Sequence, residues 1–409
     1  MSDRIDAAAF ASLCAPVPAA DFVSLLLRTG FSAEAYRDAY GDLTPLDWNA
    51  TQALAHFLQH GLDERRDAPL TLNRHALVTL ARLLPRDSAF KAKLLTHLAR
   101  HLFDNTAHPY GPAIAERWPD IRALARAGAR PYFVAGDSHS NQYALTGTRD
   151  AAWLLPIHLL CTAGSARGLA NPASRSGYGK HLRQAVEIIR TLPGGDELPF
   201  LLQFGQVDIE FVYHFRRVTD GQRTLSLDDY RAFCDTTLER YIGFVTEMFN
   251  PPQRLNVFLV SVFPPAVSDA AWRAGYVNDD IARHEEVMLP AAELPAGIRA
   301  PEIADLATGI RALEIADLRQ RTGMHAHYNA GLRAACRRHG FRFIDGFTPF
   351  LGPDGLLDPR YVIPERGGAE HHLDSRATYG AIAGMIWTCI DAMGPAPMLR
   401  SGQSPQSPP

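Results

Sequence analysis

The sequence predicts an α/β protein whose parallel sheet is covered by helices on both faces. Two observations support this fold class. Short, continuous apolar runs alternate with longer helix-like segments across the second two thirds of the 409-residue chain, as is typical of buried parallel strands. The composition is 46% hydrophobic and 21% charged, which are ordinary globular values that exclude disorder along the whole chain.

The individual elements follow in order along the chain. Residues 1–125 show apolar residues at helix-like spacings and no alternating β-branched strand, so a helical N-terminal domain is expected. Residues 126–393 form the α/β domain, and residues 394–409, rich in Pro, Ser and Gly, are predicted to be a disordered tail. Within the α/β domain the expected strands are residues 131–135, 153–160, 198–204, 255–262 and 341–344. The expected helices are residues 177–191, 226–249, 304–339 and 374–392.

Charge and cysteine usage exclude several classes of protein. The chain carries 41 Lys and Arg against 44 Asp and Glu, a net charge of −3, so it lacks the basic excess that binds a phosphate backbone. Its 5 cysteines are far apart and form no CxxC pair, which disfavours a disulfide framework or a structural zinc site. No signal-peptide pattern and no apolar run long enough for a bilayer span is found. These features predict a soluble cytoplasmic protein with no membrane span.

Candidate functional residues follow the predicted strands, because ligands of open parallel sheets bind at the carboxyl ends of the strands. Four segments stand there or before the last helix: residues 136–140 (GDSHS), 164–172 (GSARGLANP), 205–208 (GQVD) and 371–374 (HHLD). A serine after a sharp Gly turn can lie where helix N–H groups hold an oxyanion. Each segment also has an ordinary explanation, namely an N-cap, a glycine-rich turn or a surface His pair.

The order of these four segments resembles that of the GDSL/SGNH hydrolase superfamily, across roughly residues 130–393. The resemblance implies a three-layer α/β/α flavodoxin-like domain and no cofactor or metal. It implies that Ser138 is the nucleophile and that His372, followed by Leu as is common in the family, is the general base. It also implies an oxyanion hole formed by the N–H groups of Ser138 and Gly168 together with one side-chain amide. Asp137 and Asp208 are carried over as supporting residues.

Two positions depart from the family pattern. Val207 stands where the family has the oxyanion Asn, so Gln206 or Asn171 is expected to supply the amide. Ala369 stands where the family has the Asp that orients the histidine, which leaves Glu370 or Asp374 as the partner of His372, or a Ser–His dyad without one. Both departures also fit an inactive SGNH-fold protein that binds polysaccharide or acts as a scaffold.

A second resemblance concerns residues 30–66, GFSAEAYRDAYGDL…ALAHFLQHGLDERR. They are similar to a short helical module attached to bacterial cell-surface glycosyltransferases, although a plain helical cap is the simpler explanation. The hydrolase segments, too, resemble SGNH proteins found with bacterial polysaccharide genes. Together they imply an acylated carbohydrate or polysaccharide substrate, esterase or O-acetyltransferase chemistry, and association with glycosyltransferase machinery.

One rival enzyme class is a metal-dependent phosphoesterase, since Asp137-x-His139 opens that pattern. The later GNH[DE] and GHxH segments that the pattern needs are absent. Dinucleotide binding is disfavoured because no GxGxxG follows a strand. The long segment of residues 268–301, acidic in places and following the fourth strand, is expected to be a lid or substrate wall, or else a helical surface insertion.

Overall fold

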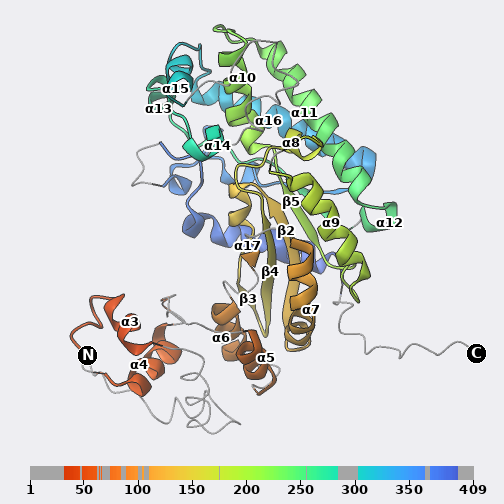
Figure 1. Cartoon of the computed structure of the whole chain (residues 1–409). Coiled ribbons are helices and arrows are strands. Elements are labelled where there is room, and N and C mark those ends of the chain that lie inside the picture. The colour runs from red at the N-terminus through yellow and green to blue at the C-terminus, as the bar shows by residue number, and fades with distance from the viewer. Residues whose placement is uncertain are drawn as a thin grey trace, which may run out of the picture.

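The computed structural model of the chain contains a seven-stranded sheet flanked by helices (Figure 1). The structure describes residues 32–46, 48–61, 64, 66, 74–83, 89–99, 104–105, 110–174, 176–254, 256–283, 303–363 and 369–394. The predicted tail lies outside the described residues apart from Gly394. The same holds for residues 284–301, the second half of the predicted lid segment.

The strands run in the order β1-β4-β2-β5-β6-β7. Every pair along this path is parallel, and the short β3 adds an antiparallel edge to β4. The strands are β1 (Asp104–Asn105), β2 (Ala129–Gly136), β3 (Thr148–Arg149), β4 (Ala152–Leu160), β5 (Phe200–Gln203), β6 (Val257–Val260) and β7 (Arg342–Ile344). Numbered among the five long strands alone, the order is 2-1-3-4-5, which is the flavodoxin-like arrangement. The predicted fold class is therefore confirmed.

All five predicted strands are present within a few residues of their expected bounds. The α-helices are α3 (Ala33–Asp38), α4 (Ala50–His56), α5 (Arg74–Leu83), α6 (Ala89–Ala99), α7 (Tyr110–Arg126), α8 (Ala166–Leu169), α9 (Tyr178–Thr191), α10 (Tyr213–Thr219), α11 (Leu227–Met248), α12 (Pro251–Arg254), α13 (Asp269–Arg273), α14 (Asp279–Arg283), α15 (Ile303–Arg311), α16 (Leu318–His339) and α17 (Ser375–Asp391). Short 3-10 or π turns are η1 (Phe57–Gly61), η2 (Ser138–Gln142), η3 (Asp208–Val212), η4 (Thr348–Phe350) and η5 (Pro359–Tyr361).

Two expectations about these elements were wrong. The single helix expected over residues 304–339 is two helices, α15 and α16, because Asp317 and Gln320 form a capping box that starts a new helix. The N-terminal region also contains a strand, β1, which is only two residues long and pairs with β4. A two-residue strand carries no alternation that a sequence pattern could reveal.

Side chains of the strands alternate between two buried cores, one on each face of the sheet. Phe133 and Ala135 of β2 join the larger core, to which α7, α9, α11 and α16 contribute. Tyr132 and Val134 join the smaller core under α17. This alternation across two helix-covered faces gives the three layers.

Some helices of the N-terminal region pack directly on the α/β domain. Helix α7, which mostly falls within the region expected to be the N-terminal domain, packs on α9 and β2, and α6 contacts β4. Tyr36 and Leu54 of α3 and α4 belong to the same buried cluster as the larger core. The boundary expected near residue 125 therefore stays a prediction, with α7 acting structurally as part of the α/β layers.

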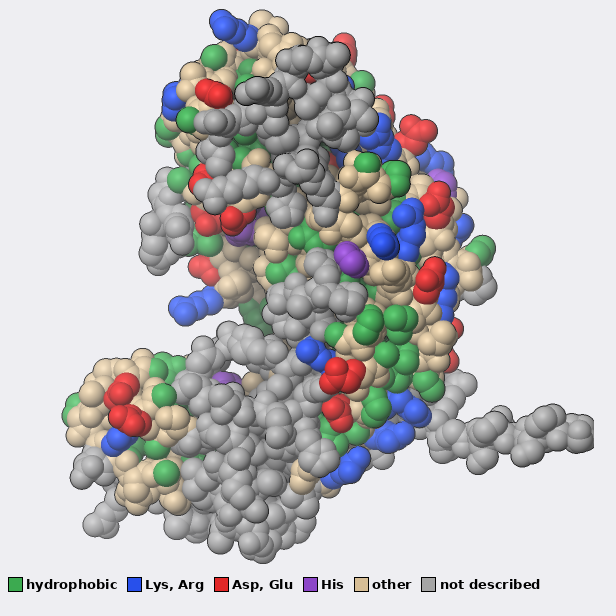
Figure 2. All heavy atoms as spheres, in the orientation of Figure 1, with side chains coloured by type: hydrophobic (Ala, Val, Ile, Leu, Met, Phe, Trp, Pro, Cys, Tyr) green, Lys and Arg blue, Asp and Glu red, His purple; other side chains and the backbone are tan. Residues whose placement is uncertain are grey.

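On the face shown in Figure 2, acidic and basic side chains are interspersed. This mixture agrees with the small net charge. Within the described part of the chain, no helix has both the length and the apolar character needed to cross a membrane.

Candidate active site

The first motif lies at a sharp turn directly after β2. Gly136 ends the strand, and a Cβ atom at this position would lie 2.3 Å from the Gln203 carbonyl oxygen and 2.6 Å from Ser140 Cβ. Only glycine therefore allows β2 and β5 to approach this closely. Asp137 then caps η2 by accepting the His139 N–H, and Ser138 is the first residue of that turn. The tight strand-to-helix turn leaves the Ser138 side chain half-buried at the carboxyl edge of the sheet.

Ser138 meets a histidine from the opposite end of the domain. The distance from Ser138 Oγ to His372 Nε2 is 2.8 Å, within the 2.6–3.2 Å range expected for a nucleophile and its base. On the other side of the ring, His372 Nδ1 lies 2.8 Å from Glu370 Oε1. A carboxylate only accepts hydrogen bonds, so Nδ1 carries the proton and the Nε2 lone pair faces the serine hydroxyl.

Glu370 is one of the two carboxylates that the sequence allowed as the partner of His372. Its Oε1 also accepts the backbone N–H groups of His371 and His372, at 3.0 and 3.1 Å. Burial alone would raise the pKa of Glu370, but the hydrogen bonds from His372 outweigh it and hold that pKa below its usual value. The carboxyl is therefore ionised near neutral pH. The alternative, Asp374, is occupied elsewhere, because it caps α17 through the N–H groups of Arg376 and Ala377.

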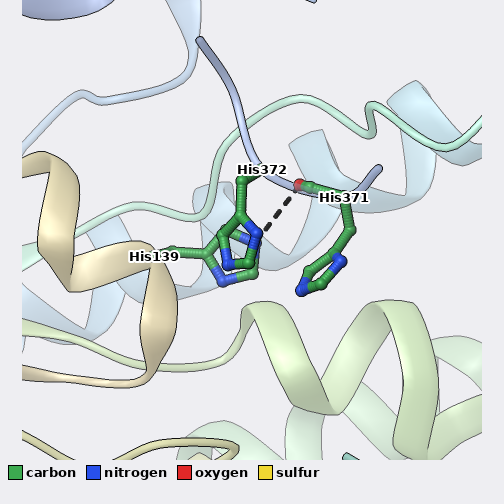
Figure 3. Close-up of side chains that lie close together, drawn as sticks. All are labelled: His139, His371 and His372. Carbon is green, nitrogen blue, oxygen red and sulfur yellow. Dashed lines mark hydrogen bonds between the residues drawn. The ribbon is translucent and has the colours of Figure 1, made fainter. Parts of the chain in front are cut away.

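A second His–carboxyl pair lies directly beneath the first. The ring centroids of His139 and His372 are 4.6 Å apart, and His139 itself is fully buried. Its Nδ1 lies 2.9 Å from Asp137 Oδ1, and its Nε2 lies 3.3 Å from the backbone oxygen of His371 (Figure 3). His139 thus joins the serine turn to the loop that carries His372. The sequence marks His139 only as a possible metal ligand, because spacing along the chain does not reveal that its ring lies next to that of His372.

The protonation state of this second pair follows from its partners. The His371 carbonyl can only accept, so the proton of a neutral His139 lies on Nε2 and Nδ1 needs a donor. Burial raises the pKa of Asp137 to about 7 and lowers the pKa of His139 well below its usual value. A protonated Asp137 that donates to a neutral His139 satisfies both bonds. The backbone N–H groups of His139 and Val207 oppose this rise in the pKa of Asp137 but do not cancel it.

His371 takes no part in the bond to Ser138. Its Nδ1 lies 3.1 Å from the Tyr276 hydroxyl, and the Phe211 ring packs edge-on against its ring. Burial and the neighbouring histidines lower the pKa of His371 to about 2, so it is neutral. Tyr276 belongs to the long segment after β6, where the structure describes short helices α13 and α14. That segment therefore contacts the site, as a lid or a substrate wall would.

The N–H group of Gly168, an expected oxyanion donor, already has a partner within the protein, so its oxyanion role stays a prediction. Its N–H donates to the Ser165 hydroxyl at 2.8 Å within the N-terminal turn of α8. The two preceding N–H groups, of Ala166 and Arg167, donate to the Asp208 carboxylate at 2.6 and 3.2 Å. Asp208 is fully buried, and burial raises its pKa to about 6 against the opposing effect of these N–H bonds. The first turn of α8 is therefore satisfied by protein groups, and Asp208 supports the site by anchoring it.

The side-chain amide of Gln206, one of the two expected amide donors, also has partners within the protein. Its amide nitrogen donates to Glu210 Oε2 at 3.0 Å, its oxygen accepts the Phe263 N–H at 2.8 Å, and the residue is fully buried. Gln206 thus ties the loops after β5 and β6 together. Asn171 forms a local turn in which its Oδ1 accepts the Ala173 N–H, so its oxyanion role stays a prediction. The Ser138 N–H has no acceptor among the described residues, since it opens η2.

The described residues contain one cluster that could be tested as a metal site, His139, His371 and His372. Their ring nitrogens lie within 4.8 Å of one another. Both nitrogens of His372 and both of His139 already have hydrogen-bond partners, and Asp137 bonds to His139 itself. This donor set does not fit a metal, so the Asp137–His139 phosphoesterase alternative is not supported by the geometry.

Comparisons with known proteins add little. No family model and no curated protein matches the chain. One similar solved structure is a Bacteroides fragilis protein assigned as an acylhydrolase, with a TM-score of 0.32 and 12% identity over 64% of this chain and 86% of that chain. Another is a GDSL-like lipase from Bacteroides thetaiotaomicron, with a TM-score of 0.31 and 11% identity over 68% of this chain and 96% of that chain. Similarity at this level supports no argument about activity, which must be argued from the site itself.

The protonation of Asp137 predicts a pH-dependent effect of Asp137→Asn on stability. Because the folded-state pKa is raised, the contribution of Asp137 to stability is present below pH about 4 and is lost as the pH rises through about 7. Asparagine does not titrate, so the variant escapes this loss. We expect urea unfolding of both proteins to show this: relative to the variant, the wild type should have a lower unfolding free energy at pH 8 than at pH 5. The limiting slope is about 1.4 kcal/mol per pH unit. An equal difference at both pH values would show that Asp137 is ionised throughout.

Proposed function

We propose that this protein is a serine esterase or O-acyltransferase, with Ser138 as nucleophile, His372 as general base and Glu370 as the group that orients the base. The observation that carries the proposal is the continuous chain of 2.8 Å contacts from Glu370 through His372 to Ser138. A nucleophile, a base and an orienting carboxylate in this order are the geometric signature of nucleophilic acyl transfer.

The reaction follows from these positions. As Ser138 Oγ attacks the ester carbonyl carbon, its proton passes to His372 Nε2. Glu370 then stabilises the imidazolium through the Nδ1–H bond. The tetrahedral intermediate collapses when His372 returns the proton to the leaving alcohol oxygen, which leaves an acyl group on Ser138. Water, or a sugar hydroxyl in an acyltransferase, attacks that acyl group by the reverse sequence and frees the serine.

The negative charge on the tetrahedral oxygen needs hydrogen-bond donors. The Ser138 N–H is one candidate, because it points from the first residue of η2 and has no acceptor among the described residues. Asn171 is the proposed side-chain donor. Asp137 and His139 hold the serine turn against the His371 carbonyl, and we assign them a positioning role rather than a part in the chemistry.

We further propose acyl esters of a carbohydrate or polysaccharide, acetyl esters in particular, as the substrate class. The resemblance of the motifs to polysaccharide-associated SGNH proteins supports this substrate, as does the helical module near the N-terminus. The same features support association with glycosyltransferase machinery, and the cytoplasmic location expected from the cysteine usage is part of the same proposal. Release of acetate from a panel of acetylated glycans tests the substrate class, and acetyl transfer between glycans separates an esterase from a transferase.

The rival function is a catalytically inactive binding or scaffold protein. The replacement of the family Asn and Asp by Val207 and Ala369 motivates that alternative. Glu370 compensates for the Ala369 departure, because its carboxylate contacts His372 from two residues away. An inactive protein has no need for a base whose lone pair faces a half-buried serine hydroxyl, so the geometry favours the enzyme.

The nucleophile is tested by Ser138→Ala, with Ser140→Ala as the matched control. Ser138→Ala should lower ester hydrolysis to the residual level of an enzyme without its nucleophile, while its melting temperature stays near that of the wild type. Ser140 is buried and bonds His158 Nε2 and the Asp137 carbonyl, so its removal should cost about 1–3 kcal/mol of stability yet retain turnover. Hydrolysis of p-nitrophenyl acetate and thermal unfolding give both readouts. Full activity of Ser138→Ala would exclude the mechanism.

The orienting carboxylate is tested by comparing Glu370→Gln with Asp374→Asn. The first change removes the charge that stabilises the imidazolium and should lower kcat by about 10²–10⁴ with little change in KM. Asparagine is a good N-cap, so the second change should keep both the α17 cap and the activity. Steady-state kinetics of the two variants decide between the carboxylates. A larger loss of kcat in Asp374→Asn would contradict the assignment.

A further inference from the structure

The described part of the long segment after β6, residues 268–283 and here called the wall segment, is fixed to the rest of the domain. Arg321 of α16 is buried, and its guanidinium donates to Asp269 Oδ1 at 2.6 Å. Trp272 is fully buried, and its ring centroid lies 5.9 Å from that of Phe211 in η3. A segment held at these points presents its remaining side chains in defined positions.

Tyr276 is the residue of the wall segment that contacts the proposed catalytic loop. Its hydroxyl lies 3.1 Å from His371 Nδ1, and a hydroxyl can donate to a neutral imidazole nitrogen or accept from it. The Tyr276 ring packs near the rings of Trp272 and Phe211, with centroids 5.9 and 6.1 Å apart. The ring and the hydroxyl thus have different partners, so the hydroxyl can be removed while the packing is kept.

His371 is placed to compete with His372 for one carboxylate oxygen. His371 Nδ1 lies 3.3 Å from Glu370 Oε1, the same atom that His372 Nδ1 contacts at 2.8 Å. That oxygen also accepts the backbone N–H groups of both histidines. A carboxylate oxygen has two lone pairs, so a further N–H from the His371 ring would weaken the bond that orients His372. The His371 ring therefore needs another partner if Glu370 is to serve His372.

We propose that Tyr276 is a positioning residue, which engages the His371 ring and so leaves Glu370 Oε1 to orient His372. The backbone of His371 is held on both sides, by Glu370 at its N–H and by His139 at its carbonyl, so its ring is the part whose partner can change. This inference rests on the proposed function and adds the wall segment to it. Because Tyr276 acts through the base, its loss should lower turnover rather than substrate affinity.

Tyr276→Phe tests the role, since it removes the hydroxyl and keeps the ring. Steady-state hydrolysis of p-nitrophenyl acetate should show kcat lowered by about 10-fold and KM within about 2-fold of wild type. Tyr213→Phe is the matched control, because it removes a hydroxyl of α10 that donates to the Ser226 carbonyl at 3.2 Å. Its kcat should stay within about 2-fold of wild type. An unchanged kcat in Tyr276→Phe, a change in KM alone, or equal losses of kcat in both variants would overturn the positioning role.

A double-mutant cycle with His371→Phe tests the route through which Tyr276 acts. This change removes the competing nitrogen and keeps a ring against Phe211. In the His371→Phe background, Tyr276→Phe should change kcat by less than about 2-fold, because no ring nitrogen is left to turn toward Glu370. The same fold-loss of kcat in both backgrounds would show that Tyr276 does not act through His371.

The same assay separates this inference from the proposed function. Turnover by the wild type that is lost in Ser138→Ala supports the proposed function, whichever way Tyr276→Phe behaves. Wild-type turnover together with an unchanged Tyr276→Phe variant would overturn the inference alone. Absence of turnover in the wild type would overturn the proposed function and the positioning role with it.

Discussion

One oxygen atom, Oε1 of Glu370, organises the loop on which the proposed chemistry depends. It accepts the N–H groups of His371 and His372 and also faces His372 Nδ1. These bonds fix both the path of the backbone and the tautomer of the ring, so that the Nε2 lone pair meets Ser138. Beneath this loop, His139 contacts the His371 carbonyl from the serine turn. The nucleophile and the base are thereby connected twice, once through their own hydrogen bond and once through the buried Asp137–His139 pair.

The sheet topology explains how residues more than 230 positions apart come together. In a 2-1-3-4-5 sheet the chain reverses its direction of winding next to the first long strand, and the connections on either side diverge there to leave a crevice. Ser138 follows that strand, β2, and the loop after the neighbouring β5 carries Asp208 and Glu210 in a π-helical turn. The close approach of β2 and β5 at Gly136 brings both loops to the same edge of the sheet.

The sequence was sufficient for the strands, the layers and the proximity of Ser138 to His372, because each depends on local patterns or on the order of motifs. It was insufficient for the oxyanion donors. Gly168 and Gln206 have the right chemistry, but their hydrogen bonds go to Ser165, Glu210 and Phe263, and such competing partners become visible only in three dimensions. The choice between Glu370 and Asp374 depended on which of the two carboxylates caps the start of α17, because that carboxylate is then not available to His372. The break between α15 and α16 was legible in the sequence, since Asp317-x-x-Gln320 is a capping box.

The most direct test of the account is intact-mass spectrometry of the protein after treatment with a fluorophosphonate, followed by mapping of the modified peptide. This reagent forms a covalent bond only with a serine whose hydroxyl is activated by a base. The account predicts a single adduct, located on Ser138. No adduct, or an adduct on another serine, would contradict the claim that the Ser138–His372–Glu370 chain is a catalytic centre.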